Sequence, residues 1–323
     1  MMRNSHQVSR QLIMLPSELP DDDLATRREK SQAKPRELGP TAISYAPTSG
    51  PILTRATGFM DAYDYTLNPY SGCSFGCTYC YAAFFSPDVE KRDTWGQWVT
   101  VKQNAVSKLS NMRTSLDGKL IYMSSVTDPY QPIERELKLT KGLLEILAEP
   151  RHRPKLVIQT RSPDVTNDIE LFQKIEANGG RVQVNMTVTT DDEDIRRTFE
   201  PSCPKNSVRL RAIANVQAAG IQSCITMTPL LLVSDPELFA DELLETDVRR
   251  FIVQPFHFTR GKFVANTRDE AARLMADKLD CEIDYFVDAY MTDYRVTESI
   301  IRNRLAEEGL ALGEGKEGFK PPF

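Results

Sequence analysis

The sequence predicts an α/β protein whose centre is a partial (β/α)6 TIM-like barrel, with an irregular N-terminal extension and C-terminal helices. Six short apolar segments, rich in β-branched and aromatic residues, alternate with helical patterns between residues 65 and 254. Two of the helical patterns stop at glycines, Gly179-Gly180 and Gly220, as helix C-termini commonly do. Consecutive β/α units favour parallel strands joined by right-handed crossovers, with chemistry at the C-terminal ends of the strands.

The expected strands and helices alternate along this part of the chain. The strands are expected at Tyr65–Asn68, Leu120–Met123, Leu156–Gln159, Val182–Val188, Ser223–Thr228 and Phe251–Gln254. The helices are expected at Val101–Met112, Thr140–Ala148, Asn167–Asn178, Asp192–Phe199, Ser207–Ala219 and Pro236–Leu244.

The barrel is expected to occupy residues 56–262, between two segments of different composition. Residues 1–55 are rich in proline and charge, which predicts an extended, partly disordered N-terminal segment. Residues 313–323 are rich in glycine and proline, which predicts a flexible tail.

A helical cover is expected over residues 263–312, where the β/α alternation has ended. Thr267 and Glu270 form a capping-box pattern before a long helix. Its apolar positions are Leu274, Leu279, Ile283, Phe286 and Tyr290. A second helix is expected from Val296 to Glu308 and could close the open side of an incomplete barrel.

Composition excludes several classes of protein. The chain of 323 residues is 41% apolar, an ordinary value for a globular protein, and six cysteines in this length do not make a disulfide scaffold. No apolar run is long enough to span a membrane and no export signal is evident, so no membrane association and a cytoplasmic location are expected. The net charge of -5 argues against a broad nucleic-acid-binding surface, which needs a basic face.

Three clustered cysteines are the main chemical feature. Cys73, Cys77 and Cys80 follow a CxxxCxxC spacing directly after the first expected strand, and Gly72 and Gly76 let the backbone curl so that the sulfurs converge. Thiolates are soft ligands that suit iron–sulfur clusters and zinc.

Three interpretations of this triplet compete. A [4Fe–4S] cluster held by three cysteines leaves one iron open for a small molecule. A structural zinc site normally takes four protein ligands, and the three histidines lie far apart without ligand spacing. Three unligated thiols in a loop are the remaining interpretation. The missing fourth ligand favours the cluster.

The triplet resembles the signature of the radical S-adenosylmethionine superfamily, and other segments are similar to its branch related to spore photoproduct lyase, which is DNA-repair-photolyase-like. The similarity extends over about residues 60 to 260. Its segments are Asn68-Pro-Tyr-Ser-Gly-Cys73, Asp128-Pro-Tyr-Gln-Pro-Ile-Glu134, Glu200-Pro-Ser-Cys-Pro204, Arg209-Leu210 and Ala219-Gly220-Ile221.

The resemblance implies two cofactors, a [4Fe–4S] cluster and S-adenosyl-L-methionine. In this superfamily the reduced cluster cleaves S-adenosylmethionine, and the resulting 5′-deoxyadenosyl radical abstracts hydrogen from a substrate; the protein orients the cofactor and excludes water. It also implies a reductant such as flavodoxin or ferredoxin as a partner. The substrate is not identified.

The end of the second expected strand is the first implied cofactor-binding segment. The resemblance places the methionyl ammonium there, near Ser125, Thr127 and Asp128, with Asp128 supplying a charge-assisted hydrogen bond. In the alternative, Asp128 caps the turn before Pro129.

The ends of the third and fourth strands supply further implied ligands. Arg161 stands where relatives usually have lysine, and its planar group can hold the cofactor carboxylate; alternatively it pairs with Asp164 or Asp168 at the surface. Asn185 and Thr187 lie on one face of the fourth strand, where they face the ribose and carboxylate or form a polar ladder inside the barrel.

The adenine side of the cofactor is the last implied contact. The fifth expected strand and Tyr79 are expected to supply mainly backbone and apolar contacts there.

The sequence departs from the spore photoproduct lyase branch at the hydrogen donor. That branch uses a thiol on the second strand, and Ser125 occupies the matching position, which argues against photoproduct-type DNA repair. Cys203 could replace the thiol if its loop folds over the site; the alternative is an ordinary loop cysteine. Cys224 and Cys281 are expected in the core.

Two other functions compete with a radical enzyme. One is a non-enzymatic iron–sulfur protein for electron transfer or sensing, which usually has four cysteine ligands. The other is a zinc-bearing nucleic-acid module, which the net charge and the missing ligand disfavour.

Overall fold

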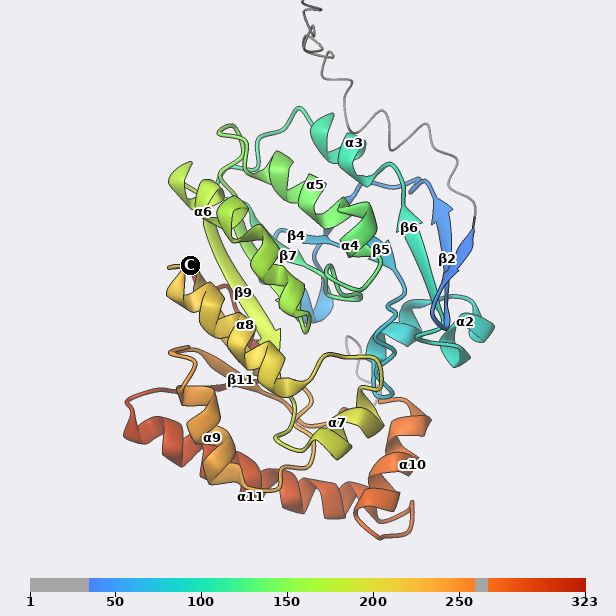
Figure 1. The fold of residues 1–323 in the computed structure, drawn as a ribbon, viewed down its shortest axis with the longest axis vertical. Helices are drawn as coiled ribbons and strands as arrows, with labels where there is room; N and C mark the ends of the chain where they lie inside the picture. Colours follow the sequence, from blue (N-terminus) through green and yellow to red (C-terminus); the bar gives the residue numbers. More distant parts are fainter. Residues whose placement is uncertain (1–34, 259–266) are drawn as a thin grey trace, which may run out of the picture. The chain divides into compact units, whose positions relative to one another are not determined.

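The computed structural model describes residues 35–258 and 267–323, and these contain a partial parallel barrel (Figure 1). Its sheet has eight strands in the order β12-β11-β10-β9-β8-β7-β4-β3. The strands from β4 to β11 in this order pair in parallel. They are β4 (Tyr65–Leu67), β7 (Leu120–Met123), β8 (Lys155–Thr160), β9 (Arg181–Thr187), β10 (Gln222–Met227) and β11 (Phe251–Val253).

The predicted fold class is therefore confirmed. Each of the six predicted strands is present, with its ends shifted by at most one residue. Within the described residues β3 and β12 remain the two edges of the sheet, so the barrel is partial rather than closed.

Helices cover the outer face of this sheet, and several of them bury apolar side chains, such as Leu143, Phe172 and Ile213. Figure 1 shows α5, α6 and α8 side by side along the sheet. The helices that follow strands are α3 (Ala105–Ser110), α4 (Glu134–Leu137), α5 (Leu139–Leu147), α6 (Ile169–Ala177), α7 (Glu193–Phe199), α8 (Asn206–Ala218) and α9 (Pro236–Leu244). The 3-10 helix η3 (Pro163–Asp168) precedes α6 and takes the first residues of the predicted helix there.

A second, smaller sheet was not predicted. Its order is β1-β2-β6-β5, with β1 (Arg36–Leu38), β2 (Thr41–Ala46), β5 (Tyr70–Ser71) and β6 (Trp98–Lys102). The helix predicted for Val101–Met112 therefore begins only at Ala105. Residues 98–102 alternate between half-buried and buried positions, which is the period of a strand.

The N-terminal extension is more ordered than predicted over its described part. Residues 35–55 contain β1, β2 and β3 (Leu53–Arg55), and β3 pairs antiparallel with β4. Apolar side chains such as Ile43 and Leu53 are buried there, which offsets the cost of ordering the chain. Residues 1–34, and the predicted boundary at residue 262, lie outside the described residues.

The C-terminal helices also differ from the prediction. The first helix, α10 (Asp269–Lys278), ends early because Asp280 adopts a left-handed backbone conformation with φ of 50°. A single helix, α11 (Phe286–Glu307), then covers both the end of the first predicted helix and the second. The predicted capping box is wrong, since Arg268 occupies the N-cap position without a side-chain cap.

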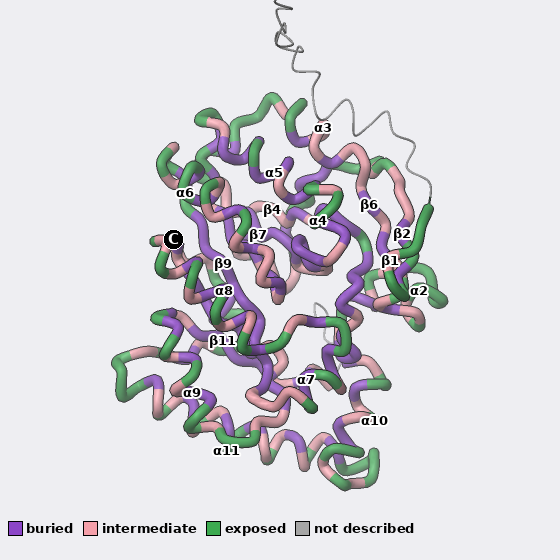
Figure 2. Tube along the Cα trace, in the orientation of Figure 1, coloured by how far each residue is buried: buried purple, intermediate pink, exposed green. Residues whose placement is uncertain are grey.

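The predicted flexible tail is part of the sheet. β12 (Leu312–Glu314) pairs in parallel with β11, and the short helix α12 (Gly315–Gly318) follows it. Phe319, which follows α12, is buried. Figure 2 shows that the buried residues are concentrated along the strands. None of the described helices combines the length and the apolar character that crossing a bilayer requires.

Candidate functional site

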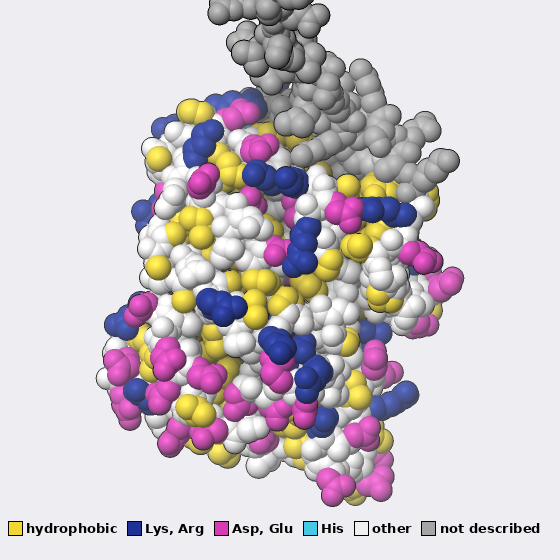
Figure 3. All heavy atoms as spheres, in the orientation of Figure 1, with side chains coloured by type: hydrophobic (Ala, Val, Ile, Leu, Met, Phe, Trp, Pro, Cys, Tyr) yellow, Lys and Arg dark blue, Asp and Glu magenta, His cyan; other side chains and the backbone are white. Residues whose placement is uncertain are grey.

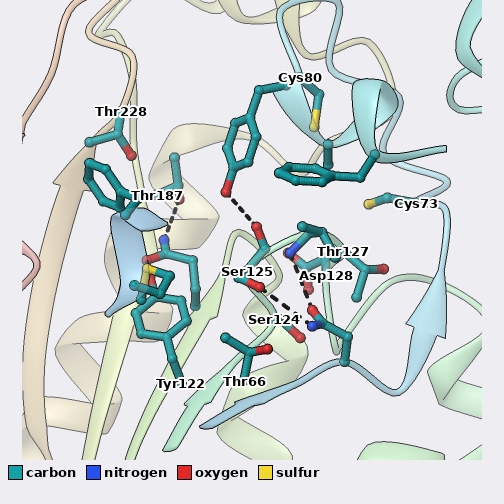
Figure 4. A pocket seen from close by; sticks show the side chains of 18 of the residues that line it. Thr66, Cys73, Cys80, Tyr122, Ser124, Ser125, Thr127, Asp128, Thr187 and Thr228 are labelled. Carbon is teal, nitrogen blue, oxygen red and sulfur yellow. Dashed lines mark hydrogen bonds between the residues drawn. The ribbon is translucent and has the colours of Figure 1, made fainter. Parts of the chain in front are cut away.

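A cavity of about 480 Å³ opens at the C-terminal ends of the parallel strands. Cys73, Cys77 and Cys80 all line it, so the fold brings the three predicted thiols to one place. Figure 4 shows Cys73 and Cys80 on one side of the cavity and Thr187 and Thr228 on the other. This is the edge at which a parallel sheet of this type places its chemistry.

The cysteine loop between β5 and the 3-10 helix η2 (Tyr81–Phe85) is a series of tight turns. The carbonyls of Cys73, Cys77 and Cys80 each accept a hydrogen bond from the amide three residues ahead, at 3.2, 3.1 and 3.4 Å. Gly72 and Gly76 have φ of +79° and +58°, a region in which glycine has no Cβ penalty. Each cysteine therefore opens a turn.

The loop is held from one side by residues that follow β7. Thr127 Oγ1 donates to the carbonyl of Gly72 at 2.6 Å, and the side chain of Gln131 accepts from the amide of Ser74 at 2.9 Å. Gln131 also donates to Thr127 at 3.2 Å, so the two contacts form one network. The segment from Thr127 to Gln131 thus fixes the position of the cysteine loop.

From the other side, the end of α7 holds the same loop. The amide of Thr78 donates to the carbonyl of Phe199 at 2.9 Å. Tyr79 Oη donates to Glu200 Oε1 at 2.5 Å. Both bonds join segments more than a hundred residues apart in the sequence, so the loop geometry depends on the complete fold.

Arg161 turns inward to the cysteine loop rather than outward to the surface. Its Nη1 donates to Cys77 Sγ at 2.7 Å and to Tyr79 Oη at 2.8 Å, and lies 3.3 Å from Glu200 Oε1. The acidic residues of the alternative surface pairing have other partners: Asp164 pairs with Arg135, and Asp168 accepts from Tyr130.

Glu200 is the centre of this buried network. Its side chain and that of Arg209 are both 0% exposed, and the two form an ion pair at 2.5 Å. Thr189 Oγ1 donates to the same carboxylate at 2.8 Å. Burial by itself would raise the pKa of Glu200, but the guanidinium groups of Arg209 and Arg161 hold that pKa at about 2. The carboxylate is therefore ionised at neutral pH.

The three thiols have different electrostatic surroundings. Burial raises the pKa of Cys73, and it raises the pKa of Cys80 to about 11. Burial would also raise the pKa of Cys77, but the hydrogen bond with Cys203 and the charge of Arg161 bring it below its ordinary value. Cys77 is thus the thiol that the protein most favours as a thiolate.

Cys203 lies behind the cysteine loop, with its Sγ 3.6 Å from Cys77 Sγ. Arg196 fixes this loop by donating to the carbonyls of Cys203 and Glu200. Among the described residues that line the cavity, Cys203 does not appear. A hydrogen donor must face the substrate, so this position argues against the donor role predicted for Cys203.

The carboxylate of Asp128 performs the alternative role as a turn cap. It accepts from the amide of Tyr130 at 2.9 Å, and also from Thr160 Oγ1 and the amide of Arg161 at 2.8 and 2.9 Å. Burial raises its pKa against the effect of these hydrogen bonds. Asp128 and Ser125 still line the cavity, and Ser125 Oγ accepts from Asn68 at 3.5 Å.

Asn185 and Thr187 belong to a polar ladder inside the barrel. Gln159 Nε2 donates to Thr187 Oγ1 at 2.8 Å, and Asn185 Nδ2 donates to Gln159 Oε1 at 3.2 Å. Thr187 reaches the cavity, whereas Asn185 is not among its described lining residues and lies below it, next to Gln183. A ligand role for Asn185 would therefore need rearrangement of the ladder.

Comparison with known proteins agrees with this geometry. The family profile described as Radical SAM superfamily matches residues 67–243, which is more than half of the chain. The chain belongs to the radical SAM superfamily. Membership implies a [4Fe–4S] cluster and S-adenosylmethionine as cofactors, and radical chemistry in general.

Two relatives of this radical SAM protein are uncharacterised proteins. An uncharacterised protein of Methanocaldococcus jannaschii is 33% identical over 187 residues, which are 58% of this chain and 66% of the relative. An uncharacterised protein of Mycobacterium tuberculosis is 28% identical, over 56% of this chain and 54% of the relative. The chain thus spans less than two thirds of the length of either relative.

Among solved structures, a mutant of spore photoproduct lyase has a similar fold. The TM-score is 0.50 at 13% identity, with 84% of each chain covered. This likeness concerns the fold, which is that of a radical SAM barrel.

The residues of this radical SAM protein fit an iron–sulfur cluster by donor chemistry. Three soft thiol donors from one loop line one cavity, and a guanidinium lies against one of the sulfurs. No three His, Cys, Asp or Glu side chains in residues 35–258 and 267–323 already converge as a metal-ligand group.

Two residues of this site were missed as functional residues by sequence reasoning. Glu200 and Arg209 appeared only as part of a resemblance. A signal for Arg209 was present, because it falls within the buried stripe of α8 together with Ala212 and Val216. A cation at an apolar helix position requires a buried partner.

Proposed function

We propose that this protein is a radical SAM enzyme in which Cys73, Cys77 and Cys80 bind a [4Fe–4S] cluster. One observation carries the proposal: all three thiols line the same cavity, and charged and polar residues at the strand ends line it too. When bound, the reduced cluster would cleave S-adenosylmethionine, and the resulting 5′-deoxyadenosyl radical would abstract hydrogen from a substrate.

The protein's own residues would bind and orient S-adenosylmethionine in the cavity. Thr127 and Asp128 would accept hydrogen bonds from the methionyl ammonium, near Ser125. Arg161 would hold the carboxylate with the part of its guanidinium not used by Nη1, and Thr187 would face the ribose. These roles are supported by their common position on the cavity wall. The same lining includes Tyr79, which would pack near the adenine.

The substrate remains open in this proposal. Besides the cysteines and polar strand ends, the cavity wall includes apolar side chains, among them Phe59, Met60, Phe85 and Phe319. Photoproduct repair is not proposed, because Ser125 replaces the donor thiol and Cys203 lies behind the loop. The face in Figure 3 shows acidic and basic side chains of the described residues interspersed, which does not favour a nucleic-acid substrate.

A small electron-transfer protein would complete the reaction. We propose a flavodoxin or ferredoxin as the reductant, since each reductive cleavage of S-adenosylmethionine needs one electron. Mixing the cluster-loaded protein with each reduced candidate and following the cluster absorbance would test this partner.

The proposal is tested by anaerobic purification followed by iron and sulfide analysis. We expect about four of each per chain and formation of 5′-deoxyadenosine from S-adenosylmethionine after reduction with dithionite. Replacing Cys73, Cys77 or Cys80 by alanine should abolish the product. Cys281→Ala is the matched control and should leave the cluster intact, because Cys281 lies between α10 and α11.

A cluster that forms but neither binds nor cleaves S-adenosylmethionine would contradict the enzyme and support an electron-transfer or sensor protein instead. Zinc in place of iron would contradict both.

A further inference from the structure

The cysteine loop is asymmetric, because among the described residues only Cys77 of its three sulfurs accepts a hydrogen bond from a guanidinium group. Arg161 and Arg209 each carry one positive charge and Glu200 carries one negative charge, so the three groups sum to one positive charge. Arg209 and Glu200 are completely buried, and the side chain of Arg161 is 16% exposed. The group in contact with Cys77 is Arg161, at 2.7 Å.

A second donor approaches the same sulfur. The Sγ atoms of Cys203 and Cys77 are 3.6 Å apart, a distance at which a thiol S–H can donate to a thiolate. Arg196 holds the Cys203 backbone at 2.8 Å, and Glu200 is three residues away in the same segment. Cys77 therefore receives two hydrogen bonds from groups that the fold fixes in place.

We propose that Arg161 and Cys203, positioned by Glu200 and Arg209, raise the reduction potential of a cluster bound through Cys77. Adding one electron makes such a site more negative, and this change is favoured by hydrogen bonds to the sulfurs and by nearby positive charge. Burial strengthens the effect, because a charge in a protein interior is poorly screened. These are positioning residues, and the inference rests on the cluster of the proposed function.

Glu200 sets the size of this effect. Its carboxylate neutralises one of the two guanidinium groups and holds Arg161 and Tyr79 toward the loop. Removing its charge should leave two uncompensated positive charges. The potential should then move in the direction opposite to the one expected on removing Arg161.

The experiment is a redox titration followed by electron paramagnetic resonance, on the full chain with its cluster and without S-adenosylmethionine. Arg161→Gln should disfavour reduction at least tenfold, which is about 59 mV for one electron. In this variant Glu200 still pairs with Arg209, so no unpaired charge is left buried in the core. Glu200→Gln should shift the potential upward. Arg135→Gln is the control, because it removes a positive charge from an exposed pair outside this network.

Cys203 gives an independent arm of the test. Cys203→Ala should lower the potential, and Cys203→Ser, which keeps a donor, should lie between alanine and the unsubstituted protein. If Arg161→Gln does not retain a cluster, Arg161→Lys replaces it in the test. Arg161→Lys keeps the positive charge, so its reduction potential must stay close to that of the unsubstituted protein. The potentials of the Cys203 variants must keep the same order.

Equal potentials for fully loaded Glu200→Gln, Cys203→Ala and unsubstituted protein would overturn the inference. Absence of a cluster from the unsubstituted protein would overturn the proposed function instead, so the two failures are distinguishable.

Discussion

At the scale of single residues, one buried carboxylate organises the back of the site. Glu200 accepts hydrogen bonds from Tyr79 and Thr189 and forms ion pairs with Arg161 and Arg209. A buried charge is tolerated only when it is paired and hydrogen-bonded, and this one is both. The resulting geometry fixes which cysteine has a cation beside it.

Loss of the Glu200 charge should destabilise the protein. We expect Glu200→Gln to lower the free energy of unfolding by about 3 to 5 kcal/mol at pH 7, because two buried guanidinium groups lose their partner. Urea denaturation measures this change. Glu136→Gln is the control: its exposed pair with Arg36 should be worth less than about 1 kcal/mol.

The same carboxylate should make stability depend on acid. Its pKa is about 2 in the folded protein against an ordinary value of 4.5, so the folded state favours the ionised form. This contribution, up to about 3 kcal/mol, is present above pH 4.5 and is lost as the pH falls toward 2. The difference between the unsubstituted protein and Glu200→Gln should shrink over that range. A difference independent of pH would contradict this account.

At the scale of elements, the cysteine loop depends on the unpredicted strand β6. A Cβ added at Gly72 would lie 2.5 Å from the carbonyl oxygen of Trp98 in that strand. Gly76 and Gly96 approach in the same way, since a Cβ on Gly96 would lie 2.7 Å from the Cα of Gly76. The glycines of the motif therefore serve packing against β6 as well as backbone conformation.

Gly72→Ala should separate these two roles. We expect a loss of about 3 kcal/mol or more in unfolding free energy, together with reduced iron binding, because strain from the left-handed backbone adds to the clash. Gly118→Ala is the matched control: Gly118 also has positive φ, of 68°, but nothing lies within 4 Å of the added Cβ. It should cost only about 1 to 2 kcal/mol. Equal losses would show that the contact with Trp98 is unimportant.

Element prediction succeeded where the pattern was local. The parallel strands are apolar runs bounded by turns, and their ends lie within one residue of prediction. β6 was missed because only Gln103 and Asn104 separate it from α3, and the pattern from Val101 onward predicts a helix. The end of α10 was missed because Asp280, not glycine, adopts the left-handed turn.

At the scale of the whole described molecule, the C-terminal tail bridges the open side of the barrel. Phe319 follows edge strand β12, and its carbonyl accepts from Tyr63 Oη at 3.0 Å beside the other edge. Its ring meets that of Phe59 edge-on, with centroids 5.5 Å apart. Phe319 also lines the cavity, so the tail forms part of the site.

Phe319→Ala should therefore affect stability and the cavity together. Phe319 is 9% exposed, and we expect its loss to lower unfolding free energy by about 2 to 4 kcal/mol. The affinity for S-adenosylmethionine, measured by calorimetry on loaded protein, should fall as water enters from this side. Leu238→Ala is the control, since Leu238 is 56% exposed and lies on α9. Unchanged stability in Phe319→Ala would contradict a bridging role for the tail.

The α/β class, the order of the parallel strands and the position of the three thiols follow from the sequence, because these depend on local periodicity and on residue spacing. The neighbours of each thiol, in contrast, depend on tertiary contacts. Arg161 and Cys203 contact Cys77 from distant segments, and Glu200 pairs with Arg161 there. Electrostatic partners at such separations leave no periodic trace in a sequence. The same reason explains the tail, whose glycines indicate flexibility until pairing with β11 orders them.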